Sequence, residues 1–158
     1  ADDPAWAARA ERVSARVRDV SELLAAAGPV PAAAPVAGRV TYDAPCHLVH
    51  AQRITAPPLQ VLHSIPQLEV VPLTDADRCC GAAGIYSLIE PGTSHAVLAP
   101  KLAHIAATKA TMVATGNPGC LMQIGAGLRM SGSSARAVHP IELLDLSYAR
   151  LYAAKQEG

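Results

Sequence analysis

Apolar side chains recur at alternating steps of four and three residues near the start of the chain. The positions that follow this spacing are Trp6, Ala10, Val13, Val17, Val20 and Leu24. Such spacing places them on one face of a helix, with charged side chains outside that face. Asp3 and Pro4 suit the first turn of a helix, and Gly28 followed by Pro29 suits its end. We therefore predict one amphipathic connector helix over residues 1–27, although a helix packed on this same domain would show the same pattern.

Residues 28–38 consist only of Pro, Ala, Gly and Val, a composition typical of a linker. Beyond this linker, short apolar runs alternate with longer segments of helical periodicity. The runs that predict strands lie at residues 39–43, 68–71, 111–115 and 135–138. We therefore predict an α/β domain over residues 39–158, with a parallel, Rossmann-like sheet of about four strands flanked by helices.

Prolines and apolar positions also mark the expected helices. A short helix is expected at residues 82–89 and a longer one at residues 94–110, where Leu98, Leu102 and Ile105 share one face. Pro100 interrupts the longer pattern, so we expect a kink or a fresh start there.

The chain contains four cysteines, and each lies in a predicted loop after one of the first three strands. Cys46 follows the first strand, Cys79 and Cys80 follow the second, and Cys120 follows the third. Because sites in parallel sheets form outside the carboxyl ends of the strands, we expect the four thiols to converge at one edge. Gly81 supplies the backbone freedom for a turn that directs the two adjacent thiols toward one centre.

Two histidines accompany the same edge of the predicted sheet. His47 directly follows Cys46, where it could donate to a cluster sulfur or replace a thiolate at zinc. A histidine that begins a helix and bonds only to backbone would look the same. His139 follows the fourth predicted strand, which also places it near this edge.

Composition and charge narrow the possible partners and locations. Of the 158 residues, 51% are hydrophobic and 16% are charged, and the formal net charge is zero. Without a basic patch, nucleic acid and anionic membrane are poor candidates as partners. No apolar run is long enough to predict a transmembrane segment, and no signal segment is recognisable. We expect a reducing, cytoplasmic setting, with any approach to the inner face of the membrane made through partners.

Several roles for the four cysteines remain open at this point. Free thiols can pack as small hydrophobes, but every cysteine here lies in a loop near Gly or Pro. A reactive dithiol at Cys79 and Cys80 is a second possibility. A metal site explains the pattern better, because thiolates select zinc or iron–sulfur clusters.

The motifs around the cysteines resemble those of the CCG, or cysteine-rich, domain family. The segments that carry the resemblance are APCHLVHAQ at residues 44–52, CCGAAGIY at 79–86, ATGNPGCLMQI at 114–124 and HPIELLD at 139–145, with VSELL at 20–24. They look most like the C-terminal CCG domain of the glycolate oxidase iron–sulfur subunit. Where the family pattern usually ends in Cys-x-x-Cys, Asn117 stands in place of the first cysteine and only Cys120 is present.

The resemblance implies a [4Fe-4S] cluster bound by Cys46, Cys79, Cys80 and Cys120, with zinc as the alternative. Around these ligands we expect His47, Gly81, Asn117 and His139. It further implies an electron-transfer domain that receives electrons from a flavin-containing oxidase subunit acting on a 2-hydroxy acid such as glycolate. The other implied partner is the rest of the chain's own iron–sulfur subunit, and the domain itself would be a non-catalytic part of the oxidoreductase. A zinc-stabilised docking module and a thiol/disulfide redox domain remain the alternatives.

Overall fold

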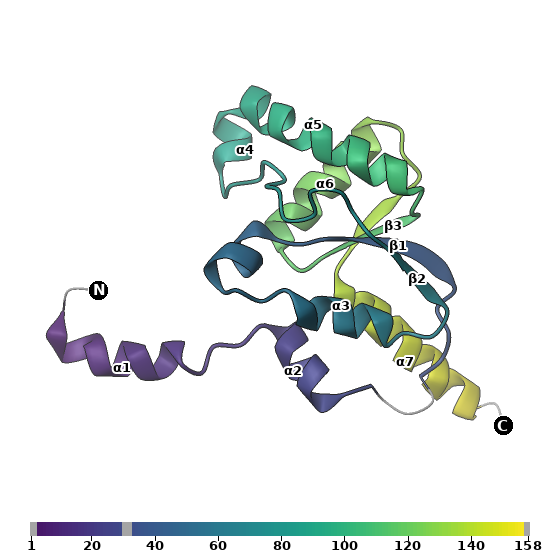
Figure 1. Ribbon diagram of the computed structural model, residues 1–158, viewed down its shortest axis with the longest axis horizontal. Coiled ribbons are helices and arrows are strands. Elements are labelled where there is room, and N and C mark those ends of the chain that lie inside the picture. Colours follow the sequence, from purple (N-terminus) through teal and green to yellow (C-terminus); the bar gives the residue numbers. More distant parts are fainter. Residues whose placement is uncertain (1–2, 30–32, 157–158) are drawn as a thin grey trace.

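The computed structural model describes residues 3–29 and 33–156, which form an α/β fold built on one parallel sheet (Figure 1). The strand order is β2-β1-β3-β4, and all three strand pairs are parallel. The strands are β1 (Gly38–Asp43), β2 (Leu68–Val71), β3 (Met112–Thr115) and β4 (Arg136–Val138). The predicted fold class is confirmed.

Helices cover both faces of the sheet in Figure 1. One layer contains α2 (Val20–Ala27), α3 (Ala56–His63) and α7 (Pro140–Gln156). The other layer contains α4 (Tyr86–Ile89), α5 (Pro91–Thr108) and α6 (Pro118–Met130). Each layer packs its own apolar cluster against the sheet, with Leu62 and Leu144 in the first and Ile105 and Ile124 in the second. All residues of β3 are buried, because helices cover both of its faces.

The prediction of one continuous helix over residues 1–27 is wrong, although an N-terminal helix is present. Helix α1 (Pro4–Ser14) is separated from α2 by five residues, and the Asp3 side chain caps α1 as expected. The break is explained by a capping box at the start of α2. Asp19 accepts a hydrogen bond from the Ser21 amide, while the Glu22 carboxylate accepts one from the Asp19 amide, both at 2.8 Å. Figure 1 shows α1 extending away from the sheet, and none of its residues is buried.

The second half of the predicted linker is anchored to the domain. Residues 30–32 of that linker lie outside the described residues, and Gly38 already belongs to β1. Val36 is 3% exposed, and its amide donates to the Pro66 carbonyl at 2.9 Å. The Ala34 carbonyl accepts a hydrogen bond from the Ser147 hydroxyl of α7. This segment therefore holds β1 to the α7 layer.

Two helical expectations are refined. Helix α5 continues through Pro100 as one element, without a fresh start. The short helix expected at residues 82–89 is limited to α4 at its end. Gly81 and Gly84 both have positive φ, so the chain turns before α4 begins.

Candidate metal centre

The cysteines lie beyond the carboxyl ends of three neighbouring strands. Cys46 immediately precedes a short π-helix (His47–Ala51) after β1. Cys79 and Cys80 lie in the loop between β2 and α4, and Cys120 lies in the first turn of α6 after β3. The sequence order of strands and loops therefore accounts for their arrival at one edge of the sheet.

The structure places the four thiols at this edge as two neighbouring pairs. The Cys80 and Cys120 sulfurs form a hydrogen bond at 3.2 Å. Cys46 and Cys79 form the second pair: they line one hollow, and Cys79 influences the pKa of Cys46. All four cysteines are free; Cys80 and Cys120 are buried, while Cys46 and Cys79 are partly exposed. The adjacent residues Cys79 and Cys80 thus belong to different pairs.

Backbone amides and thiols form hydrogen bonds with the cysteine sulfurs, and in the buried pair the pKa values shift as a result. The Gly81 amide donates to the Cys79 sulfur at 3.3 Å. The hydrogen bond with Cys120 lowers the pKa of Cys80 to about 7, with help from the Ala82 amide and against the effect of burial. The same hydrogen bond and burial hold the pKa of Cys120 far above its usual value. Within this pair the thiolate therefore resides on Cys80 and the proton on Cys120.

The partly exposed pair has a different electrostatic character. Burial first, and then the nearby Cys79, raise the pKa of the Cys46 thiol, whereas a hydrogen bond from the His47 amide opposes the shift. Backbone N–H groups of this kind favour the thiolate form that a metal requires.

Gly81 fits its position for two separate reasons. Its φ of +85° favours glycine, and a Cβ there would lie 2.5 Å from the Ser94 carbonyl oxygen of α5. The Ser94 hydroxyl donates to the Gly81 carbonyl at 2.8 Å and accepts from the side-chain amide of Gln123 in α6, also at 2.8 Å. The cysteine turn is therefore packed directly on α5 and tied to α6.

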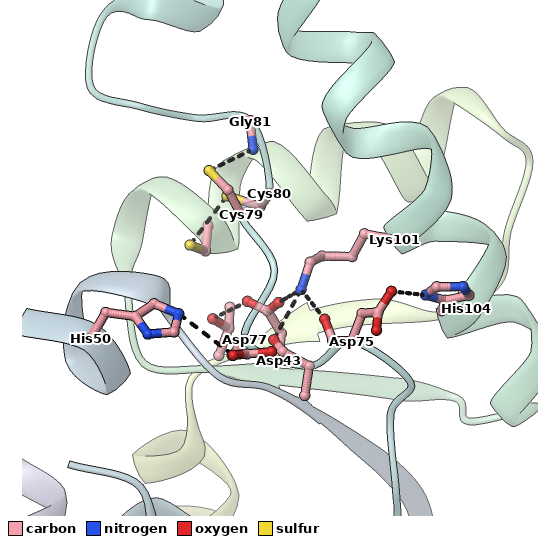
Figure 2. A network of polar contacts seen from close by, with 12 residues as sticks. Asp43, His50, Asp75, Asp77, Cys79, Cys80, Gly81, Lys101 and His104 are labelled. Atoms are coloured by element: carbon pink, nitrogen blue, oxygen red, sulfur yellow. Dashed lines mark hydrogen bonds and ion pairs between the residues drawn. The ribbon is translucent and has the colours of Figure 1, made fainter. Parts of the chain in front are cut away.

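A buried ion pair lies beneath the same loops (Figure 2). The Lys101 ammonium of α5 donates to the Asp43 carboxylate, and both side chains are 1% exposed. The other carboxylate oxygen of Asp43 accepts from the Thr115 hydroxyl at 2.8 Å. Burial raises the pKa of the Asp43 carboxyl, and the Lys101 charge opposes that shift. We take the pair as ionised, because both charged groups have hydrogen-bonding partners.

The remaining predicted residues have distinct placements. Asn117 is the N-cap of α6, and its side-chain oxygen accepts from the Cys120 amide at 3.0 Å. His47 is exposed and contributes its backbone amide to Cys46. The His139 ring accepts from the Ile141 amide at 3.2 Å, at the start of α7. Their roles around a bound metal stay predictions.

The donor set fits a thiolate-bound metal by its chemistry. Four free thiols lie at one edge of the sheet, and backbone amides already support three of the sulfurs. Among the described residues, however, no three His, Cys, Asp or Glu side chains are arranged around one centre. In a tetrahedral zinc site the sulfurs would lie about 3.8 Å apart, so both pairs would have to turn toward a shared centre.

Sequence reasoning missed the polar residues that support the site. Asp43, Ser94, Lys101 and Gln123 were not among the expected site residues. One signal was available for Lys101, which lies three residues after Leu98 and four before Ile105. A lysine on the apolar face of a helix is a candidate for a buried, paired charge.

Together, the sheet and the four thiols beyond its strand ends define an α/β domain with a cysteine-rich site. A family model described as "Cysteine-rich domain" matches residues 40–125, which include all four cysteines. The chain belongs to this CCG family.

Three similar proteins illustrate the relationship. The "Probable glycolate oxidase iron-sulfur subunit" of Bacillus subtilis (strain 168) is 37% identical over 147 residues, which cover 90% of this chain and 33% of that protein. "Lactate utilization protein A" of Shouchella clausii (strain KSM-K16) is 31% identical, with 92% and 61% covered. "Uncharacterized protein YkgE" of Escherichia coli (strain K12) is 29% identical, with 91% and 61% covered. The chain thus spans between a third and about three fifths of these relatives.

The structure also bears on membrane insertion. Within residues 3–29 and 33–156, no helix has the length and apolar character needed to cross a bilayer.

Proposed function

We propose that this chain is an electron-transfer domain that binds a [4Fe-4S] cluster through Cys46, Cys79, Cys80 and Cys120. The observation that supports the proposal is the placement of four free thiols, in loops after three strands, at one edge of the sheet. When bound, such a cluster accepts and donates single electrons at a potential set by charge, hydrogen bonds to sulfur and solvent exposure.

The chain's own contribution is to bind the cluster and to set its surroundings. Amides of His47, Gly81 and Ala82 donate to three of the sulfurs and so favour the negatively charged state of the ligands. Cys120 lies at the N-terminus of α6, where free N–H groups also favour negative charge. Partial exposure of Cys46 and Cys79 leaves one side of the site open to an electron donor or acceptor.

The proposed setting is a complex that oxidises glycolate or a related 2-hydroxy acid. The printed names of the relatives support this setting, because one is a probable glycolate oxidase iron–sulfur subunit and another a lactate utilisation protein. In this proposal a flavin-containing subunit performs the substrate oxidation. The domain and the rest of its own iron–sulfur subunit then carry the electrons. A cytoplasmic location, with contact to the membrane only through partners, belongs to the same proposal.

Exposed apolar side chains beside the cysteines support docking of a partner there. Ile85, Leu88 and Ile89 follow the Cys79–Cys80 turn and are 64–79% exposed, and Met122 follows Cys120 in α6 at 69%. Exposed apolar groups of this size commonly mark interaction surfaces.

Single replacement of each cysteine by serine tests the ligand set. After anaerobic iron and sulfide reconstitution, each variant is expected to lose most of the iron and the visible charge-transfer absorption. Met122→Ala is the matched control, because it removes another sulfur from α6 without removing a thiolate. Full iron retention in any one cysteine variant would exclude that residue as a ligand.

A dithiol redox role is the second candidate, and one observation favours it. Cys80 and Cys120 lie 3.2 Å apart, and the pKa of Cys80 is about 7, so a thiolate lies next to a thiol at neutral pH. This candidate differs from a dithiol at Cys79 and Cys80, because the contacting thiols come from different loops. Titration of metal-free protein against glutathione buffers, with the loss of two hydrogens followed by mass spectrometry, would detect it.

A further inference from the structure

Three polar residues connect the segments that carry the cysteines. Asp43 ends β1 and lies three residues before Cys46, and Thr115 ends β3 and lies five residues before Cys120. The Asp43 carboxylate accepts from the Thr115 hydroxyl, so the ends of these two strands are joined directly. The third segment, which contains Cys79, is joined through Lys101.

The Lys101 ammonium uses its three protons on two of these segments. One proton goes to the Asp43 carboxylate, and the others go to the carbonyls of Asp75 at 3.4 Å and Ala76 at 3.0 Å. The Ala76 carbonyl also accepts from the Ala44 amide at 3.0 Å, which brings the loop after β2 against the loop after β1. Figure 2 shows the Lys101 side chain reaching from α5 into this group.

We propose that Lys101 is a positioning residue for the cysteine site, which fixes the β2–α4 loop against the ends of β1 and β3. Lys101 binds the part of the loop that precedes the cysteines in the sequence. Ser94, seven residues earlier on α5, binds the Gly81 carbonyl, which directly follows them. Helix α5 therefore supports the Cys79–Cys80 turn on both sides.

The chemistry of the buried pair accounts for the use of a lysine here. A buried ammonium needs a balancing anion and a hydrogen-bond acceptor for every proton, and Asp43 and the two carbonyls supply both. The pair adds no net charge beneath the thiols, so the site can bind a negatively charged cluster without an opposing buried anion. The identity of the bound metal in this inference rests on the proposed function. The role of Lys101 in positioning the loop does not.

Hydrogen exchange of the metal-free chain tests the positioning role directly. Lys101→Met keeps the length of the side chain and removes all three donors. Exchange at residues 72–83 is expected to increase at least about tenfold relative to the rest of the sheet. Ile105→Ala is the matched control, because Ile105 is 1% exposed, lies one turn further along α5 and packs in the core of that layer.

The comparison is made at conditions where both variants are equally far from global unfolding. The same exchange pattern in Lys101→Met and Ile105→Ala would overturn the proposal, because a merely structural role predicts no local difference. Should Lys101→Met not fold, Asp43→Asn takes its place, since it removes the anion and keeps the shape. Exchange at residues 72–83 no faster than in the control would then overturn the proposal.

The iron content of the variants is a second measurement, which separates this inference from the proposed function. After anaerobic reconstitution, Lys101→Met is expected to retain less than half the iron that Ile105→Ala retains. Equal iron in the two variants, with iron bound by the wild-type chain, would contradict the positioning role. If the wild-type chain takes up no iron, the cluster is refuted. A local exchange difference between Lys101→Met and Ile105→Ala would still support the positioning role in that case.

Discussion

Two regions of the molecule differ in which side chains they bury: the sheet edge near the cysteines, and the N-terminal helix α1. At the cysteine edge, the polar side chains of Asp43, Lys101 and Thr115 are at most 2% exposed, and each has a hydrogen-bonding partner. In α1, the apolar side chains of Trp6 and Val13 are 56% and 64% exposed. An apolar stripe therefore does not establish burial, and a charged residue does not establish exposure.

The difference predicts where substitutions affect stability. Hydrogen-bonded polar groups in a buried site are costly to disturb. Removal of one partner leaves the other group buried, with no hydrogen-bonding partner and no water to replace it. An exposed helix that buries none of its residues contributes little beyond its own marginal helical stability. Substitutions should therefore have large effects at the cysteine edge and small ones in α1.

The largest expected effect comes from Asp43→Ala. This change leaves the buried Lys101 ammonium without its anion and the Thr115 hydroxyl without its acceptor. The free energy of unfolding of the metal-free chain should fall by about 3–5 kcal/mol. Urea unfolding followed by circular dichroism measures it, and a loss below about 1 kcal/mol would contradict the buried ion pair.

A smaller effect is expected from Gly81→Ala. The new Cβ would lie 2.5 Å from the Ser94 carbonyl oxygen, at a φ of +85° that alanine adopts only with strain. We expect a loss of about 2–3 kcal/mol. Gly84→Ala is the control, because Gly84 has a φ of +65° but no atom within 4 Å of its Cβ position. Equal losses in both variants would show that the contact with α5 contributes nothing.

Ser94→Ala should lower stability by about 1–2 kcal/mol. It removes the hydroxyl that donates to the Gly81 carbonyl and accepts from the Gln123 side chain. Thermal unfolding compared with Ser131→Ala, an exposed position whose hydroxyl donates only to the Leu128 carbonyl of its own helix, measures the difference. Identical midpoints in the two variants would refute the bridge between α5 and α6.

The smallest effect is expected from Trp6→Ala. Trp6 contacts the Arg9 guanidinium within α1, at 4.5 Å from the ring centroid, and α1 buries none of its residues. The free energy of unfolding should change by less than about 0.5 kcal/mol. A loss above about 1 kcal/mol in the isolated chain would mean that α1 packs on the domain.

The sheet could be predicted well from the sequence, because short apolar runs mark buried parallel strands. The predicted run at residues 68–71 coincides with β2, and the run at residues 39–43 misses only Gly38 of β1. The break before α2 was missed because Val13, Val17 and Val20 keep helical spacing across it. The signal that could have located it is Asp19 followed three residues later by Glu22.

The meeting of the cysteine loops followed from strand order, but their pairing did not. Contacts between thiols depend on loop geometry and side-chain rotation, which no spacing rule specifies. Cys80 pairs with Cys120, and not with its neighbour Cys79, next to a turn at Gly81 that packs on Ser94. The residues that hold this turn lie on α5, which contains no cysteine.

The most direct test of the proposed function is metal analysis of the wild-type chain purified without oxygen. The proposal predicts about four irons and four sulfides per chain, with little zinc. Cys120→Ser purified in the same way should lose most of that iron. One zinc per chain without iron would contradict the cluster and favour a structural thiolate site.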